Sequence, residues 1–449
     1  MGFSSISDGI KLEGTLRYRE VEDEVEGPRK RQYFETSLKP FRIVRDMRPF
    51  FLFALLLSSS WVTRAQDLAV VGAKVYASPT AAPVDNATIV IRAGKIVAVG
   101  KHVSVPAGVK TLPCADCVVF AGFWNTHVHF MEAKWMGASS QPADKLTRQV
   151  QEMVTLSGFT TVVDTASFPD ITISLRRRIE SGEVLGPRIY TAGVGLFPPN
   201  ALPYYVKGLS PELLAQLPQP GTPAEATEDV RKNIAAGSDI VKLFTGSIVG
   251  PEHIVPMPVD IATAAVAAGH RHGQLVFAHT TNLEGTRVAM QSGVDVLAHA
   301  PEVVEEIDDN LLHQMVALHM SMIPTLKLFS RDSNIADIRA EVFKFHQFGG
   351  VLMFGTDTGF LQDYDVKEEY HQLALAGFSY HDVLAMLTTA PAQRFHVEDQ
   401  DGSIAVGKRG DLTVLSADPA SDPLAFAKVR YAIRGGKVIA SAAADASGT

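Results

Sequence analysis

The chain of 449 residues lacks several features that would place it in a specialised class. It has no stretch rich in lysine and arginine, and its formal net charge is −8, so we do not expect nucleic acid as a partner. It also has no low-complexity run and no repeat with a period of 20–50 residues, which argues against a repeat architecture. The composition that remains, 46% hydrophobic and 20% charged, is that of an ordinary globular protein with room for one large domain and a smaller one.

Cysteine is scarce, because the chain has only Cys114 and Cys117, in a Cys-x-x-Cys spacing. A structural zinc site would need further ligands nearby, and none is evident. A redox motif would need a helix after its first cysteine, whereas this pair precedes a predicted strand. The spacing therefore favours a surface turn without a chemical role, open to oxidation if the protein is exported.

Long apolar runs are rare as well, and the one near the N-terminus comprises residues 50–57. It follows the short basic segment that starts at Met47, and it precedes serines and small residues. Thr63 and Ala65 suit the −3 and −1 positions of a signal peptidase site. The run is too short for a membrane span, so the pattern is that of a signal peptide.

We therefore expect translation to begin at Met47 and residues 1–46 to be an upstream extension. Residues 47–65 would be the signal peptide, and the mature protein would begin near Gln66, in the periplasm or outside the cell. The alternative is a signal anchor that stays uncleaved. No second apolar span occurs, so we expect no stable membrane span in the mature protein.

The order of the predicted elements indicates two architectures. Short strands and turns occupy residues 67–117, whereas strands alternate with helical segments from residue 118 onward, which indicates βα units and a parallel sheet. Eight strands with helical crossovers is the number found in a (β/α)8 TIM barrel, an α/β fold. The predicted strands are residues 118–125, 160–164, 188–192, 240–244, 275–279, 296–299, 321–325 and 351–357.

The C-terminal part returns to strands and turns, so both chain ends supply strands outside the barrel. We predict a small composite β-sandwich from residues 67–117 and 400–445, beside a barrel of residues 118–399. Pro324 in the seventh strand conflicts with a central position in a sheet, because proline donates no ladder hydrogen bond.

The first predicted barrel strand runs into His127 and His129, one residue apart. Side chains alternate along a strand, so these two imidazoles point the same way and can hold one metal ion. Such a pair also arises by chance among 14 histidines, so the other strand ends decide its meaning.

Further titratable residues stand at the C-terminal ends of other predicted strands, which is the face where TIM-barrel active sites lie. Together these side chains predict one metal site at the barrel mouth. The predicted metal ligands are His127, His129, Lys242, His279, His299 and Asp357.

Lys242 is the unusual member, because an ammonium group would repel metal cations and burial would depress its pKa. A lysine amine can instead react with carbon dioxide to give a carbamate, an anion whose two oxygens can bridge two metals. Its apolar neighbours on both sides argue against a solvated surface lysine.

The sequence resembles the amidohydrolase superfamily in its binuclear-metal form with a carbamylated lysine. The six residues occur in the family's order and on its strands, and the tail at residues 402–412 is similar to the family's usual tail. The resemblance covers about residues 67–440 and favours relatives of the imidazolonepropionase-like and Xaa-Pro dipeptidase (prolidase) type. Imidazolonepropionases proper are expected to lack the bridging lysine, so Lys242 counts against that activity.

The resemblance implies a role for each residue. His127, His129 and Asp357 would hold the more buried ion, His279 and His299 the more exposed one, and carbamylated Lys242 would bridge both. Zinc suits this donor set, although manganese, cobalt and iron also fit. Asp357 would act as general base and then general acid while hydroxide attacks a carbonyl.

The predicted activity is therefore hydrolysis of an amide, peptide or cyclic amide C–N bond in a small-molecule substrate. Two alternatives remain: a lactone, ester or phosphotriester hydrolase on the same binuclear site, and a non-catalytic scaffold or binding relative that would lack ligands. The sequence leaves the oligomeric state open, a homo-oligomer included.

Specificity is expected from the loops after the strands. Tyr204 and Tyr205, in the aromatic and proline-rich loop after the third strand, are candidates to bond a substrate carbonyl or carboxylate, or else pack the loop. Lys327 and Arg331, after the seventh strand, are candidates to receive a substrate carboxylate, the alternative being solvated surface charges.

Overall fold

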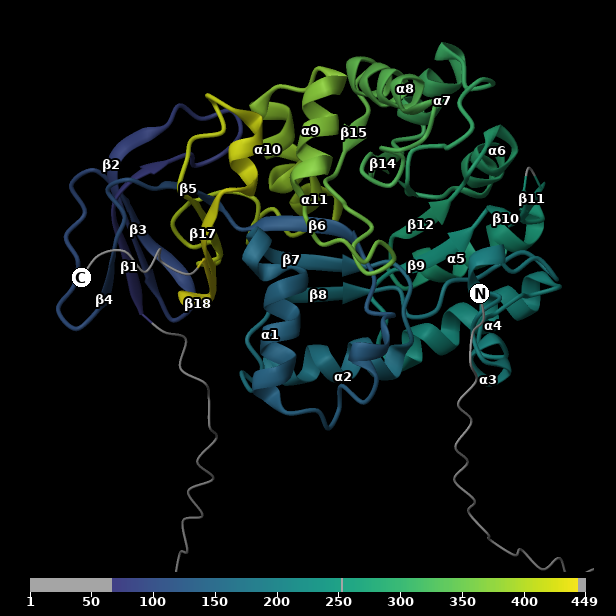
Figure 1. Cartoon of the computed structure of the whole chain (residues 1–449), viewed down its shortest axis with the longest axis horizontal. Coiled ribbons are helices and arrows are strands. Elements are labelled where there is room, and N and C mark those ends of the chain that lie inside the picture. Colours follow the sequence, from purple (N-terminus) through teal and green to yellow (C-terminus); the bar gives the residue numbers. More distant parts are fainter. Residues whose placement is uncertain (1–66, 252, 443–449) are drawn as a thin grey trace, which may run out of the picture. The chain divides into compact units, whose positions relative to one another are not determined.

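The computed structural model of the chain describes residues 67–251 and 253–442 (Figure 1). The predicted upstream extension 1–46 and signal peptide 47–65 lie outside the described residues, as do residues 443–445 at the end of the predicted sandwich. Within the described residues, no helix is long and apolar enough to cross a membrane.

Strands from both ends of the chain form one hydrogen-bonded sheet, purple and yellow in Figure 1. Its strands are β1 (Leu68–Val75), β2 (Val84–Arg92), β3 (Lys95–Gly100), β4 (Lys110–Pro113), β5 (Val118–Ala121), β16 (Leu412–Leu415), β17 (Val429–Arg434) and β18 (Lys437–Ser441). The order is β18-β17-β16-β5-β1-β2-β3, and β4 also pairs with β1. β5 joins the two chain ends, because it runs parallel to β1 and antiparallel to β16.

This single sheet does not confirm the predicted two-sheet sandwich. Alternate side chains of β5 enter different cores: Val118 and Phe120 pack with the barrel residues, and Val119 and Ala121 pack with the other strands of the sheet. Because the barrel already covers one face, a second sheet is not required to bury it.

The predicted surface turn is present, with Ala115 and Asp116 exposed at its tip. The side chains of Cys114 and Cys117 are themselves buried in the core of this sheet, with exposed fractions of 1% and 2%, and they are joined by a disulfide bond. The turn that they close lies between β4 and β5, next to β1, so its role in the described structure is to connect sheet strands.

The barrel strands lie in two parallel sheets, β6-β7-β8 and β9-β12-β13-β14-β15. Their bounds are β6 Phe123–Val128, β7 Phe159–Asp164, β8 Arg188–Thr191, β9 Val241–Phe244, β12 Val276–His279, β13 Val296–Ala298, β14 Ser321–Ile323 and β15 Val351–Leu352. Regular ladders do not close the barrel; isolated bridges between Leu196 and Leu243 and between Val128 and Thr358 lie at the two seams. The predicted closed (β/α)8 barrel is therefore present as eight strands in sequence order with two irregular seams.

Two details of the predicted strands differ. The predicted strand 118–125 is two strands divided at Gly122, where a Cβ atom would lie 2.1 Å from Thr160 Oγ1. Pro324 falls just beyond β14, so it removes no hydrogen bond from that strand.

Helices connect the barrel strands as the sequence predicts. α4 shows why: Thr222 caps its N-terminus, Pro223 occupies its first turn, and Gly237 ends it in the left-handed region at φ +109°. The longer helices are α1 Ala143–Met153, α2 Pro169–Glu180, α4 Pro223–Ala236, α5 Val259–Arg271, α6 Leu283–Ser292, α7 Asp309–Ala317, α8 Ile335–Gln347, α9 Lys367–Ala376 and α10 Tyr380–Leu387. Shorter elements are α3 Pro211–Leu214, α11 Thr389–Arg394, the 3-10 turns η1 Ala133–Trp135, η2 Thr155–Ser157, η3 Tyr204–Val206 and η4 Pro423–Ala427, and the hairpin β10 Gly246–Gly250 with β11 His253–Pro256.

Candidate metal centre and its cavity

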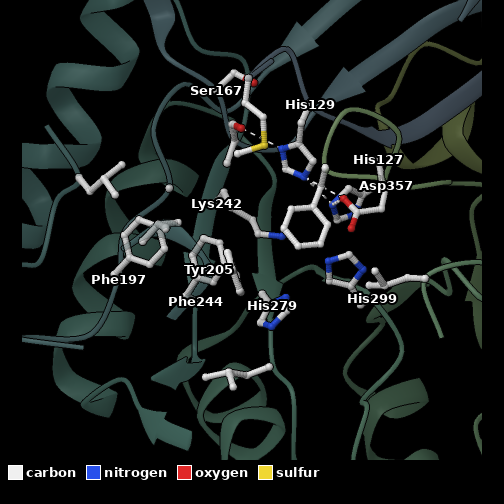
Figure 2. Close-up of a pocket in the computed structure, with 18 of the residues that line it drawn as sticks. His127, His129, Ser167, Phe197, Tyr205, Lys242, Phe244, His279, His299 and Asp357 are labelled. Atoms are coloured by element: carbon white, nitrogen blue, oxygen red, sulfur yellow. Dashed lines mark hydrogen bonds and ion pairs between the residues drawn. The ribbon is translucent and has the colours of Figure 1, made fainter. Parts of the chain in front are cut away.

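The C-terminal ends of five barrel strands bring six titratable side chains to one cavity of about 230 Å³ (Figure 2). Parallel strands end at a common edge, so residues far apart in sequence meet there. All six of the residues that the sequence singles out line this cavity. They are His127 and His129 at the end of β6, Lys242 in β9, His279 at the end of β12, His299 after β13 and Asp357 after β15.

The carboxylate of Asp357 lies at the centre of the group. Its Oδ1 is 3.3 Å from Nε2 of His127 and 3.0 Å from Nε2 of His129. The two Nε2 atoms lie 3.3 Å apart. One ligand atom from each of His127, His299 and Asp357 falls within 4.8 Å of the others, a spacing that suits one metal ion.

Hydrogen bonds on the far side of two imidazoles fix how their rings face the cavity. His129 Nδ1 lies 2.8 Å from the carbonyl oxygen of Ala166, which accepts a hydrogen bond when Nδ1 carries the proton. His299 Nδ1 lies 2.7 Å from the Thr325 hydroxyl oxygen. Such outer contacts set the tautomer and orientation of metal-binding histidines.

Two buried nitrogens of the group, His127 Nδ1 and His279 Nε2, have no hydrogen-bond partner among the described residues, and Asp357 Oδ1 faces the imidazoles of His127 and His129. A buried polar atom without a partner costs free energy, so these nitrogens need an explanation. Imidazole nitrogens and a carboxylate oxygen are ligands that divalent metals accept. The donor set therefore fits a metal centre.

Burial sets the protonation of the imidazoles. Burial, followed by nearby positive charges, holds the pKa of His127 and of His299 well below the ordinary value and lowers that of His279 to about 3. Burial also lowers the pKa of His129, but the hydrogen bond to Asp357 and the charge of that carboxylate outweigh it and raise the pKa overall. Three imidazoles are thus neutral at pH 7, the form that binds metals.

Lys242 is 1% exposed, so its amine lies in an apolar setting 5.4 Å from the centre of the Phe244 ring. Burial lowers the pKa of this amine to about 7, against the opposing effect of the Asp357 charge. A large fraction of the amine is therefore neutral and nucleophilic near neutral pH.

The segment after β15 is held tightly against β6, a feature that the sequence analysis missed. The backbone N–H of Asp357 donates to the carbonyl of His127 (3.0 Å), and that of His129 donates to the carbonyl of Thr358 (2.8 Å). Asp357 itself takes a left-handed φ of +55°. A Cβ atom at Gly359 would lie 1.8 Å from the His129 carbonyl oxygen, so glycine is required there.

The predicted substrate residues divide into two pairs. Tyr204 and Tyr205 line the cavity, and the Tyr205 ring packs edge-on to Phe360 with centroids 5.2 Å apart. Burial raises the pKa of Tyr205, so its hydroxyl stays protonated.

Lys327 and Arg331 do not line the cavity, so they do not fit the prediction that they receive a substrate carboxylate. Lys327 Nζ instead donates to the carbonyl oxygens of Asp363 (2.7 Å) and Asp365 (2.6 Å), and Arg331 is exposed. Loop contacts from 36 and 38 residues away thus decide where Lys327 points.

Two acidic residues that line the cavity, Glu302 and Asp332, were missed. Glu302 follows three residues after His299, which is the only local signal in the sequence that places it at the mouth.

A protein family and several solved structures are similar to this chain. The sequence model of the amidohydrolase family matches residues 118–439. A Xaa-Pro dipeptidase with bound methionine in its active site has a TM-score of 0.71 and is 22% identical, with 84% of this chain and 100% of that chain covered. Molinate hydrolase has a TM-score of 0.69 at 20% identity, covering 84% of this chain and 95% of that chain.

Phenylurea hydrolase B has a TM-score of 0.70 at 18% identity, covering 83% of this chain and 96% of that chain. At these identities the likeness shows a shared TIM-barrel fold. No curated protein sequence matches the chain.

Proposed function

Since the chain belongs to the amidohydrolase family and is a hydrolase of C–N bonds, we propose that it cleaves an amide, peptide or cyclic amide bond of a small molecule with the help of two divalent metal ions. One observation supports this most: four imidazoles, one amine and one carboxylate meet in a single buried cavity, with unpartnered nitrogen atoms among them. The non-catalytic alternative predicted missing ligands, whereas all six residues are present and gathered.

The side chains would divide between two ions. His127, His129 and Asp357 would hold the inner ion, His279 and His299 the outer one, and a carbamate on Lys242 would bridge both. Zinc suits nitrogen and carboxylate-type oxygen ligands. When bound, two such ions supply Lewis acidity that makes water acidic near pH 7 and polarises a carbonyl group.

The residues of the chain handle the proton. The Asp357 carboxylate faces the two imidazoles of β6 through its Oδ1, and this carboxylate can take the proton that the attacking water loses. As the tetrahedral carbon forms and the C–N bond breaks, the carboxylate returns this proton to the leaving nitrogen. The outer hydrogen bonds of His129 and His299 keep both rings oriented throughout.

Aromatic side chains form two walls of the cavity. Phe197 and Phe244 stack with centroids 4.3 Å apart on one wall, and Tyr205 packs with Phe360 on another. Such apolar surfaces lower the local dielectric constant and so strengthen charge interactions near them.

A substrate panel tests the proposal. The purified protein is assayed against amides, dipeptides, lactones and phosphotriesters. The assay is run first on protein supplied with zinc and bicarbonate, and then on protein whose metal has been removed with a chelator. We expect an amide or peptide to be turned over, activity to be lost on chelation, and zinc with bicarbonate to restore it. Turnover of lactones or phosphotriesters without any amide would overturn the proposal, as would amide turnover that survives complete metal removal.

A further inference from the structure

The cavity wall beyond the metal centre carries acidic side chains. Glu302 and Asp332 line it, and neither forms an ion pair within the described part of the chain. Hydrogen bonds of the Glu302 main chain, to Thr281 (2.8 Å) and from the Asn334 side chain (2.8 Å), fix the backbone and leave the carboxylate free. Burial and then the nearby Asp332 raise the pKa of Glu302, as expected for two carboxylates that share one wall.

Basic side chains are missing from the same wall. Among the described residues that line the cavity there is no arginine, and the only lysine is Lys242 in the metal centre. Lys327 and Lys207, next in sequence to lining residues, donate to backbone carbonyls, Lys207 Nζ to that of Val249 (3.0 Å); Arg331, next to Asp332, is exposed and does not line the cavity. A substrate carboxylate in this cavity would therefore meet two carboxylates and, outside the metal centre, no lysine or arginine among the described lining residues.

The remaining lining is apolar and aromatic. It comprises the stacked Phe197 and Phe244, the Tyr205–Phe360 pair, and Phe329, which is 4% exposed. Such surfaces bind apolar groups by burying them, and aromatic faces next to carboxylates also accept an ammonium group.

From this lining we infer that the enzyme selects apolar amides without a free carboxylate, and that it accepts an ammonium group on the substrate beside Glu302 and Asp332. This substrate class rests on the proposed C–N hydrolysis. Dipeptides and N-acyl amino acids, which present a carboxylate next to the scissile amide, would be poor substrates because like charges brought together at a partly buried wall repel.

Three matched amides test the inference. N-Benzoyl-2-phenylethylamine is neutral, N-benzoyl-L-phenylalanine adds a carboxylate next to the nitrogen-bearing carbon, and its aminomethyl analogue places an ammonium group at the same position. On zinc- and bicarbonate-loaded protein we expect kcat/KM for the neutral and cationic amides to exceed that for the anionic amide by about 10-fold or more. An anionic amide that equals or exceeds the neutral one would overturn the inference.

Variants assign the effect to the wall. In Glu302→Gln, Asp332→Asn and the double variant, the ratio of cationic to anionic kcat/KM should fall stepwise, by about 10-fold in the double variant. Glu305→Gln removes an exposed carboxylate that does not line the cavity, and it should leave the ratio as in the unmodified protein. An unchanged ratio in a folded double variant would contradict the inference.

Binding measurements separate the substrate preference from the proposed hydrolytic activity. If none of the three amides is hydrolysed, the proposed function loses support, and calorimetric binding of the same three compounds to the metal-loaded protein decides the inference. Tighter binding of the neutral and cationic compounds would support it, and tightest binding of the anionic compound would overturn it.

Discussion

Asp357 combines two roles at one residue, because its carboxylate faces both imidazoles of β6 through Oδ1. A carboxylate in this position can hold an ion with one oxygen and a proton with the other. Its left-handed backbone shows that the surrounding structure, and not local preference, fixes the side chain there.

Asp357→Asn should lower kcat by about 10²–10⁴-fold, because the amide cannot accept the proton that the carboxylate takes. Steady-state kinetics with metal analysis of the same samples measures this. Asp399→Asn, which alters an exposed carboxylate, is the matched control and should retain full turnover. Near-full turnover of the Asp357 variant with its metal intact would refute the role.

Lys242 should form a carbamate under conditions in which ordinary lysines do not. Burial lowers the pKa of its amine to about 7, and only the neutral amine attacks carbon dioxide. In chelator-treated protein at fixed dissolved ¹³CO₂, the carbamate NMR signal should therefore rise with pH and appear at a lower pH than that of exposed lysines.

Lys242→Met should abolish that signal, which identifies it among the other lysines. A carbamate that forms only at the high pH at which exposed lysines lose their proton, near 10.4, would contradict the buried amine.

At the scale of elements, the seam between β6 and the segment after β15 determines the metal centre. Three of the six proposed ligands lie on this seam, where regular strand pairing gives way to an isolated bridge between Val128 and Thr358. The close approach at Gly359 brings the two backbones together.

Gly359→Ala should destabilise the protein more than a glycine substitution at an open site. Both Gly359 (φ +103°) and Gly407 (φ +93°) are left-handed, but a Cβ at Gly407 meets no atom within 4 Å. Gly407→Ala should cost about 1–2 kcal/mol for the backbone conformation alone. Urea unfolding of metal-free protein should show a clearly larger loss for Gly359→Ala; equal losses would refute the tight seam.

The loop after β14 depends on a buried carboxylate in α9. Glu369 is fully buried and accepts hydrogen bonds from the backbone N–H groups of Leu326 (3.1 Å) and Lys327 (2.7 Å). The loop begins at Thr325, the residue that contacts His299. Burial, against the opposing hydrogen bonds, raises the pKa of Glu369 to about 8.

This shift gives a pH dependence with a defined sign. The folded pKa of about 8 exceeds the ordinary value of 4.5, so the folded state binds more protons between these pH values. The contribution of Glu369 to stability is therefore full below pH 4.5 and is lost as pH rises through 8. The loss of unfolding free energy between these pH values amounts to up to about 1.4 kcal/mol per pH unit, and Glu369→Gln should remove it.

The pH dependence is measured from the free energies of unfolding of chelated protein at pH 5 and pH 8. Glu398→Gln, which changes an exposed carboxylate, is the control. Identical pH slopes for the Glu369 variant and the unmodified protein would contradict the shift.

For the whole molecule, the sequence predicted best what the geometry of parallel strands dictates. His127, Lys242, His279, His299 and Asp357 could be placed because strand ends of a βα fold meet at one edge, whatever the loops do. The eight barrel strands followed from apolar runs between helical segments for the same reason.

What the sequence could not predict depends on contacts between distant segments. The side chain of Lys327 points toward the carbonyl oxygens of residues 363 and 365, to which it donates hydrogen bonds. The carboxylate of Glu302 is free because no basic side chain among the described residues pairs with it. The single sheet at the chain ends required knowing that β5 pairs with both β1 and β16. The burial of Cys114 and Cys117 followed from that sheet.

The proposed binuclear centre is tested by a zinc titration of chelator-stripped protein in bicarbonate buffer, with metal analysis after removal of free ions. We expect two zinc ions per chain, and fewer than two in folded Lys242→Met, which lacks the bridging group. A content near zero in the unmodified protein, or two ions bound with unchanged affinity in Lys242→Met, would contradict it.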